Sequence, residues 1–277
     1  MAHDPSARPS TPPTTQASTS PFDRQQRMSG IKKVIAVSSG KGGVGKSTVA
    51  ANLALALGQK HRVGLLDADI YGPSVPRLFG ALHQKPTINS EQKITPIERL
   101  GLKLMSIGFL VEEETAVVWR GPMLFKAMDQ FLRDVDWGPL DFLIIDLPPG
   151  TGDVQLTLAQ KVALSGAVAV TTPQNLALAD VKKAIDMWKR VQVPLLGVVE
   201  NMAYFVNPTT QERIQMFPKG ELESYLAREK LRKLAEIPLN PAVSLASEMG
   251  IPIMGSHPTS FEARAFLKMA EDLAELM

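Results

Sequence analysis

The chain has 277 residues, a formal net charge of +2 and no cysteine. This length can bury one substantial α/β core or at most two small domains, and so small a charge gives no argument for nucleic acid or an anionic membrane as partner. The missing thiols exclude disulfides and thiolate-ligated metals within one chain. No apolar run reaches about 18 residues, so we expect no transmembrane span.

Residues 1–30 are predicted to form a disordered tail in front of a single domain over residues 31–277. The first 21 residues are rich in Pro, Ser and Thr and hold almost no large apolar side chain, so they cannot offset the entropy of ordering. The tail is a poor transit peptide, because Asp4 and Asp23 dilute its arginines and no apolar face recurs at helical spacing.

From Ile31 onward, short β-branched runs alternate with helical patterns. The predicted strands are Lys33–Val37, Val63–Asp67, Leu102–Ile107, Phe142–Asp146, Ala167–Thr171 and Leu195–Glu200. Runs such as "FLIID" lack polar alternation, which is typical of parallel strands covered on both faces. The sequence therefore predicts an α/β fold with a doubly wound, mostly parallel sheet, helices on both faces, and a ligand at the carboxyl ends of the strands.

The segment "SSGKGGVGKST", residues 38–48, fits the phosphate-binding spacing G-x-x-x-x-G-K-[ST] and lies between a predicted strand and the predicted helix Ser47–Gln59. In such a loop, backbone N–H groups bind phosphate oxygens, Lys46 reaches the β- and γ-phosphates and Ser47 ligates Mg²⁺. The bland alternative, a Gly-rich turn before a helix, fits this context less well. The predicted nucleotide contacts here are Gly40, Lys41, Gly42, Gly43, Val44, Gly45, Lys46, Ser47 and Thr48.

Acidic residues follow two further predicted strands. Asp67 and Asp69 come at the end of "VGLLDAD", and Asp146 ends "FLIID". Carboxylates in these places can hold Mg²⁺, directly or through water, and orient an attacking water, although a single strand-end Asp is more often a helix cap or turn residue. The turn after Asp146 leads to Gly150, whose N–H we expect to reach a γ-phosphate.

Several collinear segments carry a family resemblance. They are "GKGGVGKST", "DADIYGPSVP", "WRGPM", "DVDWGPLDFLIIDLPPGTGD", "TTPQNLALAD" and "ENMAYF". Together they resemble the Mrp-type branch of the deviant-Walker P-loop ATPases, and most closely the nucleotide-binding-protein-like (NUBPL) iron–sulfur assembly factors. The resemblance runs over about residues 31–276, and "GFLVEEETAVVWRGPM" favours this branch over the related partition and septum-positioning ATPases.

The resemblance implies a homodimeric ATPase that uses Mg²⁺ and turns over slowly. It implies that Lys41 crosses the dimer interface to the partner's phosphates and that Asp69 is the catalytic acid, with Asp146 close to the metal. A cation supplied in this way stabilises the charge of the transition state. The family also suggests a mitochondrial location, with the cytoplasm as the alternative.

The resemblance further implies two contacts to adenine. Asn201 in "VENM" matches the residue that reads the base, and "EIPLN", residues 236–240 with Pro238, resembles the loop that closes over it. Asn201 also has an ordinary interpretation, as a turn residue after a buried strand.

One departure from the family concerns its [4Fe–4S] cluster, which two C-x-x-C pairs hold between subunits. Here Asn207 and Thr210 stand where the cysteines are expected, and neither side chain replaces a thiolate. The histidines have no ligand-like spacing either; they are His3, His61, His83 and His257. We therefore predict no Fe–S ligand in this chain, and a cysteine-bearing relative as a possible partner.

Three functions are compatible with these residues. The first is an iron–sulfur assembly ATPase acting on client proteins, the second a nucleotide-dependent scaffold without turnover, and the third a positioning switch on DNA or membrane. The last is disfavoured by the C-terminal helix, whose polar side carries acids, which suits docking on the core. Its apolar residues are Phe266, Met269, Ala270, Leu273 and Met277, and its acids are Glu262, Glu271, Asp272 and Glu275.

Overall fold

The computed structural model describes residues 25, 27–110, 121–218 and 220–277. Most of the predicted tail lies outside these residues, as do residues 111–120, which form most of "GFLVEEETAVVWRGPM". Two residues that precede Ile31 contact the domain: Gln25 Nε2 donates to the Ala159 carbonyl, and Met28 packs against the core.

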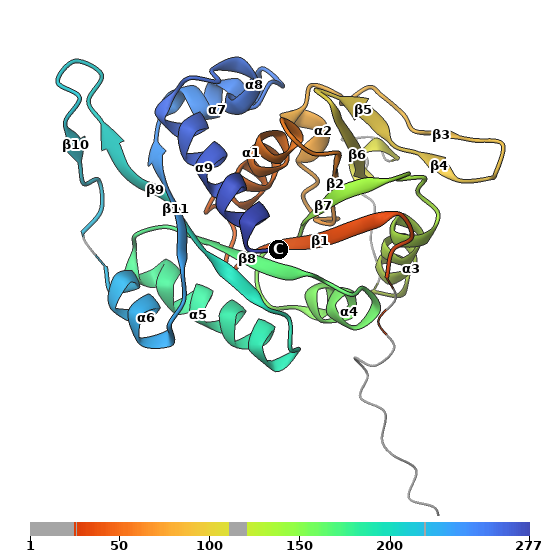
Figure 1. Ribbon diagram of the computed structural model, residues 1–277, viewed down its shortest axis with the longest axis horizontal. Coiled ribbons are helices and arrows are strands. Elements are labelled where there is room, and N and C mark those ends of the chain that lie inside the picture. Colours follow the sequence, from red (N-terminus) through yellow and green to blue (C-terminus); the bar gives the residue numbers. More distant parts are fainter. Residues whose placement is uncertain (1–24, 26, 111–120, 219) are drawn as a thin grey trace, which may run out of the picture.

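A nine-stranded sheet forms the centre of the domain, in the order β10-β9-β8-β1-β7-β2-β6-β5 with β11 also beside β9 (Figure 1). The pairings among β1, β2, β6, β7, β8, β9 and β11 are parallel, whereas β5 and β10 are antiparallel to their neighbours. The strands are β1 Ile31–Ser39, β2 Val63–Asp67, β5 Ile97–Arg99, β6 Leu102–Ser106, β7 Leu140–Asp146, β8 Gly166–Thr171, β9 Leu195–Val206, β10 Arg213–Ile214 and β11 Lys233–Leu239. A separate hairpin pairs β3 Thr87–Ile88 with β4 Ile94–Thr95.

Helices cover both faces of the sheet (Figure 1). Along β1, Ile35 and Val37 pack into the core on one face, and Val34 and Ala36 into the core on the other. The first face carries α1 Lys46–Gly58, α2 Val75–Leu78, α7 Pro241–Glu248, α8 Ile253–Ser256 and α9 Phe261–Glu275. The second carries α3 Gly121–Arg133, α4 Asp153–Lys161, α5 Asn175–Arg190 and α6 Leu222–Glu229; a short 3-10 helix η2, Ile107–Phe109, follows β6. The predicted doubly wound fold is confirmed.

All six predicted strands are present, and Val63–Asp67 is correct at both ends. The strand predicted to end at Glu200 continues to Val206, because β11 and β10 both pair with its extension. The interpretation of residues 236–240 as a loop is wrong: Glu236, Pro238 and their neighbours belong to β11, and only Asn240 lies beyond it, where it caps α7.

Helix α9 docks on the core as its pattern predicts, with Phe266, Met269, Ala270 and Leu273 buried. The prediction that the acids of this helix lie on its polar side is wrong for one residue. Glu262 is not on the solvent side but only 2% exposed, and its Oε1 accepts a hydrogen bond from Asn240 Nδ2 at 3.0 Å.

The longest helix in the described part of the chain, α5, has 16 residues and several charges. No described helix could therefore cross a bilayer.

Candidate nucleotide-binding site

The phosphate-loop sequence connects β1 to α1, as its spacing predicts. Two of its glycines are required by close packing. A Cβ on Gly40 would lie 2.1 Å from the Asp180 carbonyl carbon in α5. A Cβ on Gly45 would lie 2.3 Å from Asn201 Nδ2, and Gly45 also has a left-handed φ of +80°. The loop is thus held between α5 and β9.

Lys46 is the centre of the site. Its Nζ lies 2.6 Å from Asp146 Oδ1 and 3.8 Å from Asp69 Oδ2, and it donates to Ser47 Oγ at 3.2 Å. The side chain is only 6% exposed. Four residues predicted from three separate parts of the sequence therefore meet at one point.

The three acids lie together because their strands are neighbours. Asp67 of β2 is directly opposite Asp146 of β7, and Asp69 follows two residues later. Burial raises the pKa of Asp67 to about 7, and the charge of Asp146 adds to this. Burial also raises the pKa values of Asp69 and Asp146, while the Lys46 ammonium opposes the rise in both.

Asp67 holds the backbone that carries Asp69. Its Oδ1 accepts from the Asp69 N–H at 3.1 Å, and its Oδ2 accepts from the N–H groups of Ser74 and Val75 and from Ser106 Oγ, each at 3.0 Å. Both oxygens of the Asp67 carboxyl group therefore accept hydrogen bonds from the protein itself. The helix-cap alternative for a strand-end Asp thus describes much of what Asp67 does here.

Asp146 differs, because its Oδ2 is buried and has no hydrogen-bond partner in the described residues. A buried carboxylate oxygen left without a partner is costly, and a bound cation would satisfy it. Lys46 Nζ contacts both Ser47 Oγ and the Asp146 carboxylate. Carboxylate and hydroxyl oxygens suit Mg²⁺, so Asp146 and Ser47 fit the predicted metal.

The turn after Asp146 corrects one expectation. The Gly150 N–H donates to the Ser39 carbonyl at 2.9 Å, so in this structure it is not directed at a phosphate. The turn is fixed by Gln155, whose Nε2 donates to the carbonyls of Pro148 at 2.7 Å and Gly150 at 3.1 Å. Sequence reasoning missed Gln155, because nothing in a polar helical residue signals that it turns inward.

The remaining loop residues are placed as follows. Lys41 is half-buried, and its side chain has no hydrogen bond or ion pair with any described residue, while its carbonyl accepts from Ser39 Oγ at 2.9 Å. Gly42 and Gly43 are exposed, Val44 is buried, and Thr48 lies in the first turn of α1.

The two predicted adenine contacts lie on neighbouring strands. Asn201 belongs to β9, so its interpretation as a turn residue is wrong, and it pairs in register with Ile237, next to Pro238 on β11. Asn201 Nδ2 donates to the Val44 carbonyl at 2.8 Å. The base-reading residue of the prediction therefore also contacts the phosphate loop.

Sequence comparison settles the family. The profile of the group described as ParA, NUBPL iron-transfer P-loop NTPase, matches residues 30–274. The chain belongs to this family. It is 54% identical over 259 residues to an iron–sulfur cluster carrier protein of Aquifex aeolicus, covering 93% of this chain and 71% of that protein. It is 44% identical over 262 residues to the iron–sulfur cluster transfer protein NUBPL of Mus musculus, covering 94% and 82%.

Solved structures agree with the NUBPL-family assignment. A nucleotide-binding protein from Archaeoglobus fulgidus in complex with ADP superposes with a TM-score of 0.72 at 43% identity, covering 83% of this chain and 91% of that one. The cell division ATPase MinD of Pyrococcus furiosus gives a TM-score of 0.67 at 26% identity, with 88% and 99% covered. The chain is thus a NUBPL-family P-loop NTPase with a MinD-like fold.

In this NUBPL-family chain, residues 207–210 form a turn held by hydrogen bonds. Asn207 Oδ1 accepts from the N–H groups of Thr209 at 2.9 Å and Thr210 at 3.2 Å, and the Asn207 N–H donates to the Glu212 carbonyl at 2.9 Å. The turn connects β9 to β10. Asn207 and Thr210, at the positions where cysteines were expected, therefore serve the turn itself.

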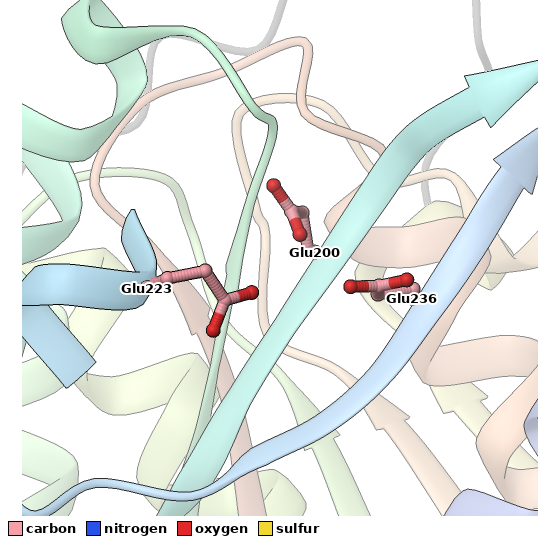
Figure 2. Close-up of side chains that lie close together, drawn as sticks. All are labelled: Glu200, Glu223 and Glu236. Carbon is pink, nitrogen blue, oxygen red and sulfur yellow. The ribbon is translucent and has the colours of Figure 1, made fainter. Parts of the chain in front are cut away.

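A second group of acids is formed by residues of two strands and a helix. Glu200, Glu223 and Glu236 come from β9, α6 and β11, and their carboxylates point toward one another (Figure 2). Lys233 Nζ contacts all three, with Glu200 Oε2 at 3.4 Å. We interpret the group as an ion-pair cluster that joins α6 to the two strands.

Proposed function

We propose that this chain binds Mg–ATP, hydrolyses it slowly as a dimer, and acts in the transfer of iron–sulfur clusters to client proteins. The single observation that carries the proposal is the position of Lys46, buried between Asp146 and Asp69 at the end of a phosphate loop. Membership of the NUBPL iron-transfer family and the likeness to an ADP-bound protein support it.

Each residue of the site has a role in this chemistry. The backbone N–H groups at the start of α1 and Lys46 bind the phosphates, for which Lys46 must exchange its contact with Asp146. Asp69 orients the attacking water, and Asp67 keeps Asp69 in place through its backbone. Ser47 and Asp146 would hold Mg²⁺, which would supply positive charge to the phosphate oxygens.

Lys41 is proposed to complete the site of a second copy. Its side chain has no polar partner among the described residues, although it lies within the phosphate loop. A lysine delivered across a dimer interface would stabilise the transition state in the partner's site and make hydrolysis depend on dimerisation.

The iron–sulfur cluster is the cargo in this proposal. Because the chain has no cysteine, its own residues do not fit a cluster, and transfer would run through the cysteines of a client or of a cysteine-bearing relative. The relatives include a mitochondrial protein of Arabidopsis thaliana and the carrier of Aquifex aeolicus, so mitochondrial and cytoplasmic placement both stay predictions.

The proposal is tested by calorimetry with ATP and Mg²⁺, followed by phosphate release. We expect the wild type to bind and hydrolyse ATP, and Asp69→Asn to bind it with little change while losing turnover. Asp186→Asn, which changes an exposed carboxylate on α5, is the matched control and should keep both properties. Wild-type binding without phosphate release would favour a nucleotide-dependent scaffold, and no binding would overturn the proposal.

A further inference from the structure

The side-chain amide of Asn201 has a fixed orientation. A carbonyl oxygen can only accept a hydrogen bond, so the 2.8 Å contact with the Val44 carbonyl requires the NH₂ group of Asn201 to face the phosphate loop. The residue is 8% exposed, and its Oδ1 makes no hydrogen bond with any described residue. One of the two N–H donors of the amide is therefore committed to the loop, whatever ligand is bound.

The contact is also a close steric one. A Cβ added to Gly45 would lie 2.3 Å from Asn201 Nδ2 and 3.7 Å from Met202 Cε. The amide thus fills the space on the inner side of the residue that begins the turn into α1. Movement of Asn201 would release both the Val44 carbonyl and the surface against which Gly45 packs.

The backbone of β9 is distorted at this residue. Ile237 of β11 is opposite Asn201, yet Leu239 is opposite Phe205, so β9 uses four residues where β11 uses two. Met202 has a left-handed φ of +56°, which is unusual for a residue with a side chain. Bulges and strained residues often re-aim a side chain beside a functional site.

We propose that Asn201, aimed by this bulge, is a positioning residue that holds the phosphate loop in its binding conformation. The inference rests on the proposed nucleotide binding and adds that Asn201 acts on phosphate affinity, whatever base is attached. It links strand β9 to the loop through one amide.

A ligand without a base separates this role from base recognition. In calorimetry with Mg²⁺ and inorganic tripolyphosphate, Asn201→Ala should bind about fivefold more weakly than the wild type, the effect of one hydrogen bond to a buried carbonyl. Its affinity for ATP should fall by at least the same factor. Asn89→Ala, which removes an amide with its own hydrogen bonds in the β3–β4 hairpin, is the control and should bind both ligands as the wild type does.

A second pair of variants tests the bulge with Asn201 left in place. Glycine adopts a left-handed backbone readily, so Met202→Gly should keep the tripolyphosphate affinity of the wild type within about twofold. A β-branched residue resists this conformation, so Met202→Val should bind tripolyphosphate several-fold more weakly. This pair decides the matter if Asn201→Ala does not fold. Equal affinities of the two Met202 variants would then overturn the inference.

The outcomes distinguish this inference from the proposed function. If the wild type binds ATP and tripolyphosphate, and Asn201→Ala loses affinity for ATP only, Asn201 reads the base and the inference is wrong. If the wild type binds neither ligand, nucleotide binding itself is wrong and the inference falls with it.

Discussion

Lys46 Nζ and Asp146 Oδ1 form an ion pair 2.6 Å long inside the domain, where the lysine side chain is 6% exposed and the aspartate fully buried. The pair lies at the N-terminus of α1, where phosphates are expected to bind. The structure therefore shows the lysine that is predicted to bind phosphate paired with the protein's own carboxylate.

Replacing Lys46 should affect stability as well as binding. Lys46→Ala leaves Asp146 without its counter-charge and should lower the free energy of unfolding by about 3 kcal/mol at neutral pH. Added Mg–ATP should raise the unfolding midpoint of the wild type but not of the variant. Urea denaturation with and without Mg–ATP measures both effects. Lys60→Ala, which removes an exposed ion pair with Glu271, should cost less than about 1 kcal/mol and keep the ATP effect.

Lys41 should act on the partner's site. Activity per subunit should rise with protein concentration, and Lys41→Ala should lower turnover more than affinity. Mixing Lys41→Ala with Asp69→Ala protein gives heterodimers in which one site has its own Asp69 and receives Lys41 from the partner. Phosphate release should then recover in part; no recovery, with dimers seen by light scattering, would remove this role.

The wild type should hold no iron–sulfur cluster of its own. Its sequence contains no sulfur ligand of the thiolate kind, and Asn207 is used in a turn. Anaerobic reconstitution with iron and sulfide should give no more visible absorbance than a denatured control. The double change Asn207→Cys, Thr210→Cys places two thiols at the spacing of the family and should bind iron. Stoichiometric iron and sulfide on the wild type after gel filtration would contradict the prediction.

The nucleotide-free protein should lose stability as pH rises toward 7. The pKa of Asp67 is raised from 3.8 to about 7 by burial and by Asp146, so between these values the folded state binds more protons than the unfolded one. Its contribution is therefore greatest near pH 4 and is lost by pH 7, with a slope of at most about 1.4 kcal/mol per pH unit. Asp69 and Asp146 shift in the same direction.

Urea denaturation in EDTA across this interval measures the slope. Asp67→Asn should make it smaller, although the other two acids keep it from vanishing. Stability that increases with pH over the same interval would show that these carboxyl groups are not protonated as described.

Local patterns predicted the parts of the fold whose cause is local. Val63–Asp67 is an apolar run buried on both faces, and the spacing of Gly40, Gly45, Lys46 and Ser47 places the phosphate loop. β11 was missed because "KLAEIPL" contains a proline and mixes apolar with charged residues. The pairing with β9 makes it a strand, and that partner lies more than 30 residues earlier in the chain.

The site was predicted in its residues more than in their roles. The three acids were found because each follows an apolar strand. The hydrogen bonds that distinguish Asp67 from Asp146 come from Ser74, Val75 and Ser106, whose approach depends on the folded chain. The same is true of Gln155 and of the bond from Asn201 to Val44, where no spacing in the sequence signals the partner.

Strand β9 carries Asn201 beside the phosphate loop and leads at its far end into the turn at Asn207. Because that turn closes through its own backbone and one asparagine, it needs no metal crosslink to keep its shape. Residues 207–212 are thus suited to loop grafting, in which a metal-binding or peptide-binding turn replaces the native one. The nucleotide site is built from other contacts and should be unchanged by the replacement.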